Sequence, residues 1–153
     1  MSFLEYQKES PEFLNNYLKY KRYVDCAAQT TVDEAYYDLR TLFRYIKLYL
    51  YNNSNLYNIT KDEFLKIDIK DITIEDLGEM NKNDLESYIF FLDNTLENIS
   101  KTRNRKLASM KRLYEYLEVN NLISVNPTKF MQVAKIEKRQ PKYLTLDESR
   151  KLL

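Results

Sequence analysis

The sequence predicts an all-α fold, a compact bundle of four to five helices followed by a C-terminal linker. Three observations carry this prediction. Gly and Pro, which interrupt helices, number only one and three in 153 residues. Apolar residues recur three and four positions apart, which is the spacing of one helical face. A chain of this length can also bury a hydrophobic core without disulfides, and Cys26 is its single cysteine.

The first helices are predicted from their start signals. Ser10 followed by Pro11 indicates an N-cap and a first helical residue. Thr31 and Glu34 have capping-box spacing at the start of an apolar stripe, which predicts a long helix ending near Tyr51. Four polar residues at 52–55 then predict a loop, because Asn tolerates the left-handed backbone conformation.

The segment 60–80 carries two conflicting patterns. Its isoleucines alternate as in a strand, whereas Thr60 and Glu63 form another capping-box pattern. We expect short helical turns at 61–65 and 74–77, joined by an extended piece.

Two longer helices are predicted after residue 80. Asn81 or Asn83 caps the first, which ends near residue 96. Ser100 or Thr102 caps the second, which ends at residues 120–121 and carries a buried stripe of Leu107, Met110, Leu113, Tyr114 and Leu117.

The domain boundary is predicted at residue 132, so that 1–132 form the helical domain. Asn126 and Pro127 indicate a short helical turn just before it. Residues 133–144 lose the apolar periodicity and contain several basic residues and Pro141, which is typical of a linker. A capping-box pattern opens one more helix in 145–153, too short to be stable alone, so we expect a truncated catalytic domain to begin there.

The composition excludes several classes of function. Without histidine, the chain has no Ser-His-Asp or Cys-His nucleophile system and no His-based zinc site. The single Gly78 cannot build a glycine-rich phosphate loop. The strongly apolar run 88–92 is too short to cross a bilayer, and residues 1–9 have no basic signal-peptide head. We therefore expect a cytoplasmic protein with no cofactor, no metal site, no membrane contact and no small-molecule substrate.

Charge is segregated along the chain although the net charge is only +1. Residues 101–112 contain six basic side chains and no acidic one, whereas 62–97 contain eleven acidic side chains and three lysines. Such a charge distribution produces a directed field that suits docking onto a polyanion.

The basic helix has further features of a nucleic-acid contact, although a solvated helix face is the simpler alternative. Hydroxyls at Ser100 and Thr102 lie where a phosphate could also meet free backbone N–H groups. Basic residues at a helix start oppose the helix dipole, so an anionic partner would explain them. The side chains expected to lie off the apolar stripe, free to reach a groove, are Arg103, Arg105, Lys106, Ser109 and Arg112.

Five segments, in this order, resemble the N-terminal core-binding (SAM-like) domain of tyrosine recombinases, or integrases, and of their Xer-type members in particular. They are PEFLNNYL, TTVDEAYYDLRTLFRYI, ITIEDL, SKTRNRKLASMKRLYEYLEVNNLISVNP and PKYLTLDESRKLL. The resemblance covers nearly the whole chain.

The resemblance implies half of a clamp on duplex DNA, with two helices crossing in the major groove. The positions that match DNA-contacting places in the family are Thr31, Arg40 and Arg44 on the first helix and Lys101, Thr102, Arg105 and Lys106 on the second. Lys138 and Arg139 in the linker are also expected to contact DNA. Asp33 and Glu34 depart from a uniformly basic surface.

The resemblance also implies a role in site-specific DNA recombination and integration, with other recombinase protomers as partners in a synaptic complex. The family's catalytic Arg, Lys, His and nucleophilic Tyr belong to a later domain, so this chain is not expected to be an enzyme. Tyr36, Tyr88, Tyr114 and Tyr116 fall on helical faces and are expected in or around the core. The alternatives are a helical protein–protein interaction module or a stand-alone DNA-binding regulator; a metal-dependent nuclease is disfavoured.

Overall fold

The structure, a computed structural model, describes residues 3–132. Within that range it has seven α-helices, one short 3-10 helix and no strand, which confirms the all-α prediction. Five helices have seven residues or more: α1 (Phe3–Glu9), α2 (Glu12–Tyr23), α3 (Gln29–Tyr51), α6 (Lys82–Asn94) and α7 (Ser100–Val119). The remaining elements are short: η1 (Asn53–Asn55), α4 (Lys61–Phe64) and α5 (Ile74–Gly78).

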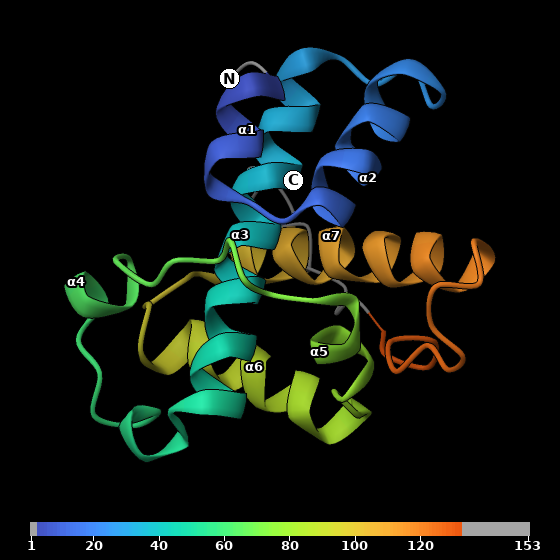
Figure 1. The fold of residues 1–153 in the computed structure, drawn as a ribbon. Helices are drawn as coiled ribbons and strands as arrows, with labels where there is room; N and C mark the ends of the chain where they lie inside the picture. Colours follow the sequence, from blue (N-terminus) through green and yellow to red (C-terminus); the bar gives the residue numbers. More distant parts are fainter. Residues whose placement is uncertain (1–2, 133–153) are drawn as a thin grey trace, which may run out of the picture.

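The central element is α3, and α7 crosses it about halfway along (Figure 1). On one side of the crossing, α2 packs on α3 and α1 packs on α2; on the other side, α5 packs on α3 and α6 packs on α7. Because neighbours surround it, α3 buries side chains around most of its circumference: Val32, Ala35, Tyr36, Asp38, Leu39, Leu42, Phe43, Tyr45, Ile46 and Leu48.

The buried face of α7 is the one that the sequence predicts. All five residues of its expected stripe are buried. The ring of Tyr17 on α2 meets Tyr116 of α7 edge-on at 5.0 Å, so aromatic contacts also join α2 to α7. Tyr36, Tyr88 and Tyr114 are buried and Tyr116 is half-buried, as expected for core and rim aromatics.

The first three helices begin differently from the prediction. The sequence patterns do not predict α1, which buries Tyr6. Ser10 does not cap α2, because its hydroxyl donates to the Tyr6 carbonyl, and Pro11 holds the N-cap position without a side-chain cap. The capping box predicted at Thr31 is wrong: α3 begins at Gln29 after Ala28, again without a side-chain cap.

Capping boxes do start the three helices between residues 60 and 94. The predicted box of Thr60 and Glu63 is confirmed, and Asn81, rather than Asn83, caps α6. A further box at Thr73 starts α5. The short turns expected at 61–65 and 74–77 are therefore present, and α6 ends two residues before the predicted position.

After α7 the chain forms a turn rather than the helical turn expected at Asn126 and Pro127. The Asn126 side-chain oxygen accepts hydrogen bonds from the backbone and hydroxyl of Thr128, which is an Asx-type turn. Met131 then packs into the core. The predicted linker and the start of a second domain lie outside the described residues.

None of the helices within residues 3–132 is long and apolar enough to cross a membrane.

Candidate nucleic-acid interface

The crossing of α3 and α7 is fixed by a buried carboxylate. Asp38 on α3 has a side chain that is 1% exposed. It accepts hydrogen bonds from Arg105 at 2.9 Å (Nη2) and 3.2 Å (Nε) and from the Ser109 hydroxyl at 2.8 Å. A guanidinium that donates two nitrogens to one carboxylate forms a strong, oriented pair. This carboxylate therefore determines where Arg105 points.

Arg105 remains available to a ligand although it is paired. Its side chain is 44% exposed, and its Nη1 lies 3.9 Å from Glu34 Oε2. Hydrogen bonding to Asp38 raises the pKa of the guanidinium, so the charge is permanent. Because Glu34 contacts Arg105, it is not spent on a cap; instead it reduces the local positive charge.

The prediction for Ser109 is wrong. It is buried at 7% exposure, and its hydroxyl is used by Asp38, so it does not lie off the apolar stripe or reach toward a groove. Its position between Leu107 and Met110 places it on the inner side of α7, where α3 covers it.

Lys106 lies beside the crossing and is partly buried. Its ammonium donates to the Asn98 side-chain oxygen at 2.7 Å. Burial lowers the pKa of Lys106, Asp38 opposes that shift, and Arg105 and Lys61 lower the pKa further by repulsion. Lys61, the first residue of α4, is thus brought to the basic side chains of α7. The sequence gives no signal for this, because Lys61 borders the acidic stretch.

The first turn of α7 differs from the prediction in its cap. Ile99 holds the N-cap position, and neither Ser100 nor Thr102 caps the helix. The first backbone N–H groups therefore have no side-chain acceptor within the described range, which leaves them able to meet an anion. Lys101 is exposed and has no ion-pair or hydrogen-bond partner among residues 3–132, while Thr102 is half-buried.

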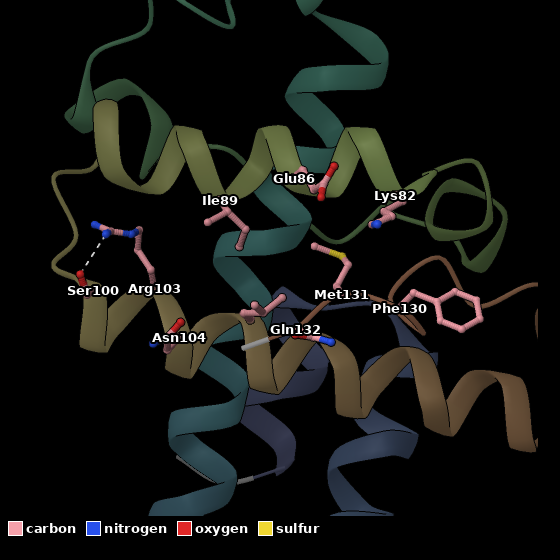
Figure 2. A pocket seen from close by; sticks show the side chains of 10 residues that line it. Lys82, Glu86, Ile89, Ser100, Arg103, Asn104, Phe130, Met131 and Gln132 are labelled. Atoms are coloured by element: carbon pink, nitrogen blue, oxygen red, sulfur yellow. Dashed lines mark hydrogen bonds between the residues drawn. The ribbon is translucent and has the colours of Figure 1, made fainter. Parts of the chain in front are cut away.

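Arg103 is folded back against the α6–α7 connection rather than free. Its guanidinium donates to Asp93 at 3.0 Å, to the Ser100 hydroxyl at 3.0 Å and to the Asn98 carbonyl. Figure 2 shows its bond to Ser100 at the edge of a hollow of about 480 Å³ between α6 and α7. The expectation that Arg103 is free to reach a groove is therefore wrong.

The two arginines predicted on α3 lie away from Asp38. Arg40 is 3.5 Å from Glu9 of α1, and its guanidinium lies over the ring of Tyr37 at 5.0 Å. Arg44 donates from Nε to the Ile67 carbonyl at 3.1 Å, and burial lowers its pKa. Successive helical residues turn by about 100°, so Arg40 is on the opposite side of α3 from Asp38. The fold does not gather these arginines with the cations of α7.

The other predicted contacts are distributed as follows. Thr31 is exposed in the first turn of α3. Arg112 is exposed two turns after Arg105 and has no ion pair within the described part of the chain. Lys138 and Arg139 lie outside the described residues. Contact between any of these residues and DNA stays a prediction.

Residues 3–132 contain no group of three or more His, Cys, Asp or Glu side chains that could hold a metal ion. The cations, hydroxyls and backbone N–H groups of α7 can bind anions through charge and hydrogen bonds, and Glu34 and Asp38 lie beside them at Arg105.

Comparison with known proteins connects this arrangement to a family. The tyrosine recombinase XerC of Caldanaerobacter subterraneus subsp. tengcongensis is 37% identical over 154 aligned residues, which cover all of this chain and 42% of that protein. The chain belongs to the Xer-like tyrosine recombinase family. XerC of Leptospira interrogans (strain Fiocruz L1-130) is 26% identical over 117 residues, and XerC of Thermodesulfovibrio yellowstonii is 34% identical over 65 residues.

The chain spans less than half the length of the XerC proteins it matches, with 37% of the Leptospira protein and 22% of the Thermodesulfovibrio protein covered. No family model matches the sequence. No solved structure matches it either. The membership in the Xer-like family therefore rests on the sequence matches, and the all-helical fold agrees with it.

Proposed function

We propose that this chain is the DNA-binding part of a Xer-like tyrosine recombinase, which holds one side of a duplex during site-specific recombination. The observation that carries the proposal is the α3–α7 crossing, where a buried carboxylate orients a half-exposed arginine. Lys106 is the next residue along α7 and is repelled by both Arg105 and Lys61, and Lys101 is exposed one turn before Arg105. We also propose that the protein is located in the cytoplasm, as we expect from the sequence.

The proposed contacts divide into two kinds. Arg105 is held in a fixed direction by Asp38, and an oriented guanidinium suits recognition of a base edge in the major groove. Lys101, with the uncapped first turn of α7, suits phosphate contacts that are independent of sequence. Specificity would thus come mainly from the crossing, and affinity from the residues around it.

Catalysis is assigned to residues outside this chain. The sequence contains no histidine, and its matches cover only part of each relative. The chain is therefore proposed to bind a duplex without cutting it and to act together with other recombinase protomers. Incubation of the purified chain with supercoiled DNA and Mg²⁺ tests this, and reproducible cleavage would contradict it.

Duplex binding is tested by fluorescence anisotropy at several salt concentrations. With on the order of five neutralised phosphates, the slope of log affinity against log salt should be roughly −4 to −5. The double variant Lys61→Ala with Lys101→Ala leaves the Asp38–Arg105 pair intact, so it should stay folded and lose about two units of that slope. Lys8→Ala, on an exposed lysine of α1, is the matched control. Absence of salt-dependent binding by the wild-type chain would refute the proposal.

A protein-contact role is the second candidate, favoured by two large apolar side chains at the surface. Phe90 on α6 is 58% exposed, and Phe130 at the hollow of Figure 2 is 77% exposed. Other recombinase protomers would be the partners in that case. Backbone NMR shifts on adding duplex distinguish the roles, since a module that binds only proteins should show none over residues 100–112.

A further inference from the structure

A second hollow, of about 390 Å³, lies between α2 and the C-terminal half of α7. Tyr17 and Lys21 of α2 line one side, and Arg112 and Tyr116 of α7 line the other. Of these residues only Arg112 is among the expected DNA contacts, and α2 has no part in the interface described above.

Lys21 is the unusual residue of this hollow. It is only 9% exposed, yet its ammonium has neither an ion pair nor a hydrogen bond with any residue in 3–132. The ammonium still reaches solvent, because among residues 3–132 the fully buried side-chain atoms without a partner belong to Arg40, Tyr45 and Tyr88. An ammonium with reduced hydration and no bonded acceptor is suited to bind an anion. Burial is the main cause that lowers the pKa of Lys21, repulsion from Arg112 adds to it, and the Asp25 carboxylate acts in the opposite direction. The two cations therefore face each other across the hollow.

Tyr17 adds a third donor without an acceptor. It is 4% exposed, and within the described residues its hydroxyl makes no hydrogen bond. Burial raises the pKa of Tyr17 to about 12, while Arg112 acts in the opposite direction. Asp25 and Glu115 also line the hollow, but neither forms an ion pair with Lys21 or Arg112 in the described structure. Three donors thus converge with no acceptor bonded to them.

We propose that this hollow binds a phosphate group through Lys21, Arg112 and the hydroxyl of Tyr17. Arginine and lysine are the side chains that bind phosphate by charge-assisted hydrogen bonds, and the phenol supplies a neutral donor. A bound phosphate would remove the repulsion between the two cations and provide the acceptor that all three donors lack.

The proposed source of the phosphate is the backbone of a bound duplex. This part of the proposal rests on the proposed function. Arg112 follows Arg105 by seven residues, which places both on nearly the same side of α7 about 10 Å apart along its axis. A strand that meets Arg105 can therefore also meet the hollow, and α2 would add a contact beyond the crossing. Free phosphate offers the same chemistry, so the experiment separates the two sources.

The first measurement combines stability with duplex affinity in Lys21→Met. Replacing an unpartnered buried cation with an apolar side chain should leave the urea midpoint unchanged or raise it. The same change should weaken duplex binding several-fold and reduce the magnitude of the salt slope by about 0.9. Lys19→Met, on an exposed lysine of the same helix, is the matched control and should alter the slope less. A merely structural lysine would instead lower stability.

The second measurement uses inorganic phosphate without DNA. NMR of the lysine and arginine side chains should show shifts at Lys21 and Arg112 that saturate with phosphate and are absent with sodium chloride at equal ionic strength. The proposal is overturned if Lys21→Met binds duplex as tightly as the wild type while the double variant Lys61→Ala with Lys101→Ala binds duplex more weakly. In that case the proposed function would hold without a phosphate site in the hollow. If the wild type binds no duplex, the proposed function fails, and the presence or absence of the phosphate shift at Lys21 decides this site by itself.

Discussion

The basic first half of α7 and the acidic stretch 62–97 are both single-sign charge runs in the sequence, but the fold uses them differently. In the acidic stretch many carboxylates bond within the molecule. Glu63, Asp76 and Asp84 each accept the backbone N–H of a helix N-cap residue. Tyr49 and Tyr51 of α3 donate their hydroxyls to two of these same carboxylates.

Four of the six cations of α7 also bond within the molecule, namely Arg103, Arg105, Lys106 and Lys111. The other two, Lys101 and Arg112, have no ion pair within residues 3–132, and Arg105 keeps 44% of its side chain exposed while it bonds Asp38. A run of like charges therefore indicates a binding surface only where the fold leaves charged side chains without an internal ion pair or hydrogen bond. The four predictions below test that difference.

Arg105→Ala should have the largest effect, because Arg105 is the cation of α7 that pairs with a buried carboxylate. The substitution leaves the Asp38 carboxylate buried with only the Ser109 hydroxyl as its donor. Breaking a buried ion pair costs about 3–5 kcal/mol, and solvent access to the arginine favours the lower end of that range. Urea unfolding followed by circular dichroism at pH 7 measures the loss. Arg105→Lys keeps the charge without the guanidinium fork, so its unfolding free energy should lie between those of the wild type and Arg105→Ala. If Arg105→Ala unfolded with a free energy within about 0.5 kcal/mol of the wild type, the assigned role would be contradicted.

Asp76→Ala tests the internal use of the acidic stretch. Asp76 is 4% exposed, closes the capping box of α5 and accepts the Tyr51 hydroxyl. Its removal should destabilise the domain by about 1–2 kcal/mol through lost cap and hydrogen-bond energy. Duplex affinity should hardly change. Glu75→Ala, on the exposed neighbour in the same helical turn, provides the comparison and should alter stability by under about 0.5 kcal/mol; equal losses in the two variants would show that the cap is not the cause.

The carboxyl groups of Glu63 and Asp71 should titrate below their ordinary pKa values of 4.5 and 3.8. The Thr60 backbone N–H lowers the pKa of Glu63, and the Lys47 ammonium, 2.9 Å away, lowers that of Asp71. Because these folded-state pKa values are depressed, their contribution to stability is present above the unfolded-state values and is lost as pH falls through the folded ones. Carbon-13 NMR of the carboxyl groups measures both, and Lys47→Met should raise the pKa of Asp71 while Glu63 stays unchanged.

Lys101→Ala should have the smallest effect on the fold. Its ammonium has no partner in the described structure, so the unfolding free energy should stay within about 0.5 kcal/mol of the wild type. The slope of log affinity against log salt for duplex DNA should lose about 0.9 in magnitude, which corresponds to one phosphate contact. A clear loss of stability, or an unchanged slope, would remove the contrast between α7 and the acidic stretch.

Two identical spacings show how far local patterns predict this fold. Thr60 and Glu63 form the predicted capping box, whereas Thr31 and Glu34, with the same separation, do not. Glu34 instead approaches Arg105, which is far away in the sequence. A local pattern is reliable where no distant side chain competes for its members, and no window of a few residues reveals that competition.

The candidate interface was predictable in part for the same reason. The six cations of residues 101–112 indicate an anion-binding helix, and the exposure of Lys101 and Arg112 agrees with that interpretation. The burial of Ser109 and the approach of Lys61 were not predictable, because each depends on which helix lies opposite.

The sequence by itself determined most of the helices, although not α1 or the caps of α2 and α3, since helical periodicity and capping depend mainly on residues at most four positions apart. It also determined the buried stripe of α7 and the absence of histidine chemistry. Only the tertiary structure decided which charges remain available, because the pairs that satisfy them join distant residues, as Asp38 joins Arg105 and Ser109. A buried carboxylate must be paired to stay charged, and the side chain that pairs it is fixed by how α7 crosses α3.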